Sequence, residues 1–134
     1  MDAPTRAGLR AIPLFAGLDD EALAMLAART TEFEAPAGQV LVEIGQPGAG
    51  LFVIESGEVE VDLPGGRTAV LGPGGFFGEI ALLTDRPHTA RVRVMRPVRC
   101  VALDRSVFLE LVRKQPSIAV AMLPVLAARV ADLT

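Results

Sequence analysis

The chain has 134 residues, which is the size of one domain with a single hydrophobic core. Apolar residues make up 51% of the sequence and charged residues 22%, a balance that excludes an intrinsically disordered chain. The net charge of −3 excludes the basic surface that sequence-independent nucleic-acid binding requires, so we expect no direct nucleic-acid binding. A single cysteine, Cys100, and a single histidine, His88, exclude an internal disulfide and a multi-histidine metal site, so no metal ligands are predicted.

The sequence also lacks the usual signals for export and membrane insertion. Its first residues do not have the basic region and the apolar core of a signal peptide. The longest apolar run, residues 118–128, is too short to cross a bilayer. We therefore expect a cytoplasmic domain with a reduced cysteine and no membrane span.

We expect one domain over residues 1–134, with helices at both ends and strands between them. Residues 19–29 are rich in helix formers, and Asp19 is placed to cap that helix. The apolar stretch 12–15 is expected to anchor the N-terminal segment to the core. The N-terminal helical segment, the strand-rich middle and the C-terminal helices cover residues 1–29, 30–104 and 105–134.

Short runs rich in Val, Ile, Leu and Phe occupy the middle of the chain. The expected strands cover residues 39–44, 51–55, 57–63, 89–94 and 98–104. Turns rich in glycine and proline separate these runs, among them Ser56-Gly57 and residues 72–75. This spacing of strands and turns is typical of an all-β sandwich or barrel.

The chain closes with two predicted helices, residues 106–115 and 117–133, separated by Pro116. The second helix is apolar on almost every side, and such a helix needs cover on more than one face. We expect it to be a movable or partner-seeking element, for example in a homodimer formed through the C-terminal helices. Plain packing against the core is the alternative that the sequence leaves open.

Residues 76–92 carry the strongest functional pattern in the sequence. Gly78 opens a short helical turn that begins at Glu79, and the start of a helix exposes unpaired N–H groups that attract an anion. Arg86 and His88 follow closely and offer further donors to the same anion. The Glu79 carboxylate would repel a bare phosphate but suits a ligand that also has hydroxyl groups, such as a ribose. The pattern therefore predicts a site for a sugar phosphate or a nucleotide.

Residues 77–83 and 86–90 resemble the phosphate-binding cassette of the cyclic nucleotide-binding domain family. Three other segments resemble further parts of that family: residues 12–18 its N-terminal segment, residues 38–41 an early strand and residues 51–59 its central hairpin. Together these segments extend the resemblance over essentially the whole chain.

The resemblance implies an eight-stranded β-roll, a double-stranded β-helix of jelly-roll type, with N-terminal helices and C-terminal lid helices. It also implies that a cyclic nucleotide, with cyclic AMP favoured, binds inside the roll, and that no other cofactor is needed. Glu79 would accept a hydrogen bond from the ribose 2′-hydroxyl, residues 68–71 would form part of the wall around the base, and residues 117–133 would be the lid. The ligand-binding residues implied by the resemblance are Gly78, Glu79, Ile80, Ala81, His88, Thr89 and Ala90.

The sequence departs from the family pattern at one position. The arginine that usually pairs with the phosphate is replaced by His88. Arginine offers a permanent charge and a planar fork, whereas histidine offers one donor and a titratable charge. We therefore expect cyclic nucleotide binding to be weak and to strengthen as the pH falls.

Two kinds of function remain open at this point, and a third is disfavoured. The first is a regulatory module that binds a cyclic nucleotide and signals through its C-terminal helices to an effector domain or protein outside this chain. The second is a degenerate domain of the same fold that serves protein interaction or oligomerisation. A metal-dependent β-barrel enzyme would need several histidine and carboxylate ligands, and the sequence has no recognisable catalytic motif, so no enzyme is expected. A DNA-reading helix-turn-helix would have to follow Thr134, so we expect none in this chain.

Overall fold

The computed structural model describes residues 4–47, 50–84 and 86–133, and residue 85 of the segment 76–92 lies outside the described residues. Three short helical pieces open the chain: α1 (Arg6–Arg10), the 3₁₀ turn η1 (Pro13–Phe15) and α2 (Asp20–Arg29). The Asp19 carboxylate accepts a 2.8 Å hydrogen bond from the Ala22 N–H, which confirms the predicted cap of α2.

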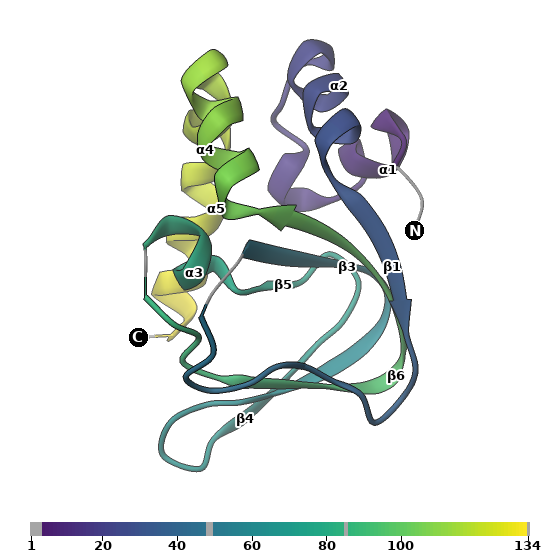
Figure 1. Cartoon of the computed structure of the whole chain (residues 1–134), viewed down its shortest axis with the longest axis vertical. Helices are drawn as coiled ribbons and strands as arrows, with labels where there is room; N and C mark the ends of the chain where they lie inside the picture. Colours follow the sequence, from purple (N-terminus) through teal and green to yellow (C-terminus); the bar gives the residue numbers. More distant parts are fainter. Residues whose placement is uncertain (1–3, 48–49, 85, 134) are drawn as a thin grey trace.

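The strands form one antiparallel sheet that curls into a roll (Figure 1). β6 lies between β1 and β3, β4 pairs with the other edge of β3, and the short β2 and β5 pair with β6 and β3. This mainly β architecture with flanking helices confirms the predicted fold class. The strands are β1 (Thr31–Ala35), β2 (Val40–Val42), β3 (Gly50–Asp62), β4 (Thr68–Leu71), β5 (Phe76–Phe77) and β6 (Arg91–Asp104).

The described residues form six strands rather than the expected eight, because two strands run through points where a break was predicted. The predicted turn at Ser56-Gly57 is a bulge inside β3, where the register with β6 shifts. Gly57 has φ +86°, and a Cβ atom there would collide with the Pro97 carbonyl of β6. The bulge bends β3 without ending it, and β6 continues through Pro97 in the same way.

Buried side chains form two clusters, one under the helices and one inside the roll. The first includes the N-terminal apolar stretch, in which Ile12, Leu14 and Phe15 are all buried, as expected for an anchor. The second includes Phe77 and Cys100. Burial raises the pKa of the Cys100 thiol to about 12, so this side chain stays protonated and acts as a small apolar residue.

Three helices follow β5: α3 (Glu79–Leu83), α4 (Arg105–Lys114) and α5 (Ser117–Leu133). Figure 1 shows α4 and α5 side by side, with the C-terminal end of α5 near α3. Ile118 and Met122 pack α5 against the core, whereas Val120 and Leu123 on another face are 66% and 58% exposed. Within the described ranges, none of the helices is both long enough and apolar enough to span a membrane.

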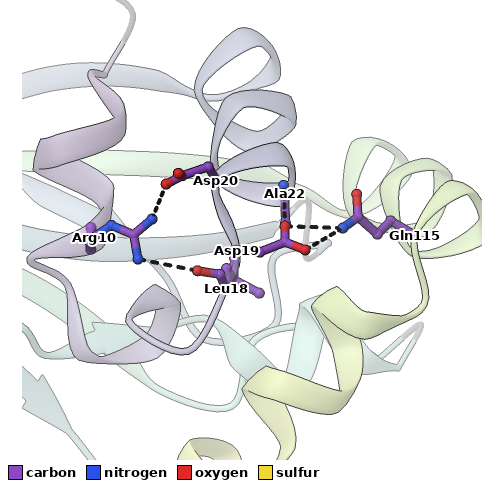
Figure 2. Close-up of polar contacts among 6 residues, drawn as sticks. All are labelled: Arg10, Leu18, Asp19, Asp20, Ala22 and Gln115. Carbon is purple, nitrogen blue, oxygen red and sulfur yellow. Dashed lines mark hydrogen bonds and ion pairs between the residues drawn. The ribbon is translucent and has the colours of Figure 1, made fainter.

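The first and last helical parts of the chain meet at a polar junction (Figure 2). Asp19 accepts hydrogen bonds from the side-chain amide of Gln115, the residue that ends α4. Arg10 pairs with Asp20 and donates to the Leu18 carbonyl, which fixes the turn before α2. The junction holds α2 against the point where the chain enters α5.

Candidate functional site

A cavity of about 370 Å³ lies inside the roll, between the strands, the segment 76–92 and α5. This volume is in the range of small-molecule sites. Ala69 and Leu71 of β4 line it, so residues of the segment predicted to form a wall do face the cavity. Most of the lining is apolar, and the strand residues and their flanks that contribute are Val42, Val61, Leu63, Ala69, Leu71, Phe77 and Val92.

Most of the residues predicted as ligand-binding line this cavity. Ala81 is the exception: it is 1% exposed and is not among the lining residues, so any role for it would involve its backbone. Arg86, considered as a further donor, is exposed and also lies outside the lining. The predicted residues that face the cavity are Gly78, Glu79, Ile80, His88, Thr89 and Ala90.

The turn at Gly78 brings Glu79 to the cavity. Gly78 has φ +87°, and a Cβ atom there would lie 2.5 Å from the Gly50 carbonyl oxygen. Only glycine combines this conformation with so close an approach to β3. Leu82 is fully buried and donates its N–H to the Gly78 carbonyl at 3.1 Å, which holds α3 in place. The Glu79 side chain is therefore fixed at the cavity and is only 16% exposed.

His88 is held by backbone hydrogen bonds to the loop after β2. Its N–H donates to the Gln46 carbonyl at 3.0 Å, and its carbonyl accepts from the Gly45 N–H at 2.9 Å. Its ring lies beside Gly78, because a Cβ atom on that glycine would be 3.6 Å from the His88 Cε1. Burial lowers the pKa of His88, so the imidazole is neutral at pH 7 and offers the cavity a single N–H donor without charge.

Arg129 of α5 is a polar residue of the cavity that the sequence analysis missed. It donates to the Phe76 carbonyl, and its guanidinium carbon lies 4.3 Å from the centre of the Phe76 ring. Its Nη1 is 3.8 Å from Glu79 Oε1, and its side chain is 20% exposed. Leu126, one turn earlier in the helix, also lines the cavity. Arg129 is the single basic residue of a largely apolar helix, and this was the one signal in the sequence that pointed to it.

The arrangement suits binding better than catalysis. The apolar walls can cover a flat ring, the Glu79 carboxylate can accept hydrogen bonds from hydroxyl groups, and the donors of His88 and Arg129 can meet an anion. Among the residues that the structure describes, no group of three or more His, Cys, Asp or Glu side chains could hold a metal ion.

A second hollow, of about 650 Å³, lies outside the roll beside Pro36 and Pro97. Its charged side chains already pair with neighbours in the sheet. Arg99 contacts Glu34 at 3.4 Å and Glu55 at 3.8 Å, and it also donates to Glu32. The charged side chains that line this hollow, Glu34 and Arg99, are thus already paired, and the cavity inside the roll is the better candidate.

Comparisons with known proteins show the family of the chain. Residues 32–115 match the family model described as the cyclic nucleotide-binding domain. A cyclic nucleotide-gated potassium channel of Mesorhizobium japonicum is 36% identical over 109 residues, which are 81% of this chain and 30% of the channel. A CRP-like cAMP-activated global transcriptional regulator of Mycobacterium tuberculosis is 31% identical over 121 residues, which are 87% of this chain and 54% of the regulator. The chain thus spans about half or less of the length of these relatives.

A solved structure resembles the fold over nearly its full length. It is the N-terminal domain of a transcriptional regulator from Streptomyces coelicolor, which superimposes with a TM-score of 0.75 at 34% identity. The match covers 95% of this chain and 94% of that domain. With its fold and its sequence in agreement, the chain belongs to the cyclic nucleotide-binding domain family.

Proposed function

We propose that this chain is a non-catalytic regulatory module that binds a cyclic nucleotide, with cyclic AMP preferred, in the cavity inside the roll. The observation that carries the proposal is the meeting of the Glu79 carboxylate and the His88 donor in a largely apolar cavity of about 370 Å³. A relative that is activated by cyclic AMP supports the choice of ligand.

In the proposed complex each part of the ligand meets a different part of the lining. Glu79 accepts a hydrogen bond from the ribose 2′-hydroxyl. His88, Thr89 and the backbone from Gly78 to Ala81 donate to the phosphate. The base lies against Leu71 and its apolar neighbours, with Ile80 and Ala90 completing the wall. A cyclic phosphate suits this site because its charge is low and its ring is compact.

We propose that α5 transmits the effect of ligand binding to a partner. Ligand binding would favour one position of this helix, and a partner that reads that position would respond. The exposed apolar face at Val120 and Leu123 supports a homodimer formed through α5, or contact with an effector domain or protein. The domain itself is proposed not to contact nucleic acid, because its net charge is −3, and a reducing cytoplasm suits the buried thiol of Cys100.

A second candidate is a domain of the same fold with little or no nucleotide affinity that serves protein interaction or oligomerisation. The observation in its favour is the neutral, partly buried His88 at the position where the family usually has arginine.

Calorimetric titration with cyclic AMP, cyclic GMP and linear 5′-AMP separates the two candidates. The proposal predicts saturable one-to-one binding of cyclic AMP, weaker binding of cyclic GMP and no binding of the linear nucleotide. Absence of saturable heat up to about 1 mM of either cyclic nucleotide, from a protein that melts cooperatively, would favour the second candidate.

A further inference from the structure

The charges in the cavity are unusual for a site that receives an anion. Within the described part of the chain, three ionisable side chains line the cavity: Glu79, His88 and Arg129. Burial lowers the pKa of His88, so at neutral pH it is uncharged. The Glu79 carboxylate and the Arg129 guanidinium then cancel, and a phosphodiester that enters brings one further negative charge.

Arg129 is placed to form charged hydrogen bonds with the phosphate of the ligand. A guanidinium has five N–H donors in a planar fork, and the hydrogen bond to the Phe76 carbonyl uses only a part of them. The 3.8 Å separation from Glu79 is longer than a hydrogen bond, so this pair leaves donors available. The 20% exposed side chain keeps these donors at the cavity, in surroundings where a charged contact is less screened than at the surface.

We propose, resting on the proposed function, that Arg129 is the cation that contacts the phosphate of the ligand and is shared between the phosphate and Glu79, so that the positive charge of this site is carried by α5 and not by the segment 76–92. His88 then acts as a neutral donor beside it. The loss of arginine at position 88 is compensated from another element of the fold.

This arrangement makes ligand affinity depend on the position of α5. When the C-terminal end of α5 covers the cavity, Arg129 offsets the charge of Glu79 and an anion can enter. When that end is displaced, the cavity keeps the Glu79 charge alone and repels an anion. Ligand and closed helix therefore favour each other, and the coupling is reciprocal.

The helix has a point at which its end can move separately. Ile118 and Met122 fix the first half of α5 in the core, whereas Arg129 lies in the second half. Pro124 between them has no N–H, so the Val120 carbonyl lacks its usual partner in the helix. Leu126 in the second half is buried in the same cluster as Ile118 and Met122, so a shift of the end of α5 would move Leu126 together with Arg129 while Ile118 and Met122 stay packed.

Cyclic AMP titrations of charge variants in the full chain test this inference. Arg129→Gln is expected to weaken binding by at least about tenfold, because a charged contact is lost and Glu79 is left unpaired. Arg129→Lys, which keeps the charge but loses the planar fork, is expected to weaken binding less than Arg129→Gln. Arg113→Gln removes the same charge from an exposed position on α4 outside the cavity and should not change the affinity.

A double variant then tests whether a cation on the segment 76–92 can replace Arg129. His88→Arg in the Arg129→Gln background should restore most of the affinity, because the charge returns to the segment 76–92. It should not restore the ligand-induced slowing of hydrogen exchange at the end of α5, which requires Arg129. Together, these two results would support a cation that resides on the helix.

The possible failures are distinguishable. If wild type shows no saturable binding, the proposed function fails and this inference with it. If wild type binds and Arg129→Gln binds equally well, this inference alone is overturned. A large loss of affinity in Arg86→Gln, with Arg129→Gln unchanged, would place the cation on the segment 76–92 and would also overturn it.

Discussion

The side-chain amide of Gln115 donates to the carboxylate of Asp19, at 3.2 Å to Oδ1 and 3.4 Å to Oδ2 (Figure 2). The same carboxylate caps α2 through the Ala22 N–H. One side chain therefore stabilises the start of α2 and also holds the end of α4, directly before α5 begins. The start of α5 is fixed by the N-terminal segment, and its far end reaches the cavity through Arg129.

Asp19→Ala is expected to lower the free energy of unfolding by about 1–2 kcal/mol, because it removes a helix cap and the link to Gln115 together. Urea denaturation measures this change. Asp20→Ala is the matched control, since its carboxylate is exposed and pairs with Arg10 at the surface, and such surface pairs contribute about 0–1 kcal/mol. Equal losses in the two variants would contradict the role given to Asp19.

Gly78→Ala is expected to destabilise the fold by about 1–3 kcal/mol and to weaken cyclic nucleotide binding. The added Cβ atom would lie 2.5 Å from the Gly50 carbonyl in a left-handed conformation, so the turn before Glu79 must shift. Gly72→Ala is the control, because nothing lies within 4 Å of a Cβ at that position and its φ is not in the left-handed region. Denaturant titration of both variants tests this, and a Gly78→Ala protein as stable as Gly72→Ala would contradict it.

The affinity for cyclic AMP is expected to rise as the pH falls. Burial lowers the pKa of His88 in the free protein, and a bound phosphate would raise it, because an anion favours the imidazolium. Binding then takes up protons, so affinity increases as the pH drops through the bound-state pKa and levels off below the free-state pKa. Titrations from about pH 5.5 to 8.5 measure the slope. The neutral variant His88→Gln should lose it, and a wild type with no slope would show that His88 does not contact the phosphate.

Leu123→Glu is expected to abolish any dimer formed through α5 and to leave cyclic nucleotide binding intact. The side chain is 58% exposed, whereas the neighbouring Met122 is buried, and a charge at Leu123 opposes burial against a second copy. Sedimentation velocity at several protein concentrations measures the association. Val70→Glu on β4, where the side chain is 54% exposed, is the control. Equal effects of the two variants would remove α5 from the interface.

The sequence predicts the part of the site that is local in the chain. Gly78, Glu79 and His88 lie within one short segment of the sequence. The turn at Gly78 and the ligand chemistry of Glu79 and His88 can therefore be inferred from that segment alone. Arg129 could not be predicted in the same way, because its contact with Glu79 depends on the path of α4 and α5 around the roll.

Prediction of the fold has the same limit: local features follow from the sequence, and contacts between distant segments do not. The cap of α2 follows from Asp19 alone and was predicted. The continuity of β3 through Gly57 could not be predicted, because a glycine in the left-handed conformation can either end a strand or bend it. The Pro97 carbonyl of the paired strand decides between the two, and the sequence does not reveal that approach. The five-residue helix α1 was too short to leave a periodic pattern.

The central claim is that a cyclic nucleotide binds in the roll with its ribose 2′-hydroxyl on Glu79, and a cycle of four calorimetric titrations tests it most directly. Cyclic AMP and 2′-deoxy cyclic AMP are each titrated into wild type and Glu79→Gln. Loss of a charged hydrogen bond should weaken wild-type binding of the deoxy ligand by roughly 10- to 150-fold, equivalent to about 1.5–3 kcal/mol. In Glu79→Gln the deoxy ligand should lose a clearly smaller factor, because the amide oxygen can accept only an uncharged hydrogen bond from the hydroxyl. If the deoxy ligand loses the same factor in both proteins, the ribose does not contact Glu79, and the placement of the ligand is wrong.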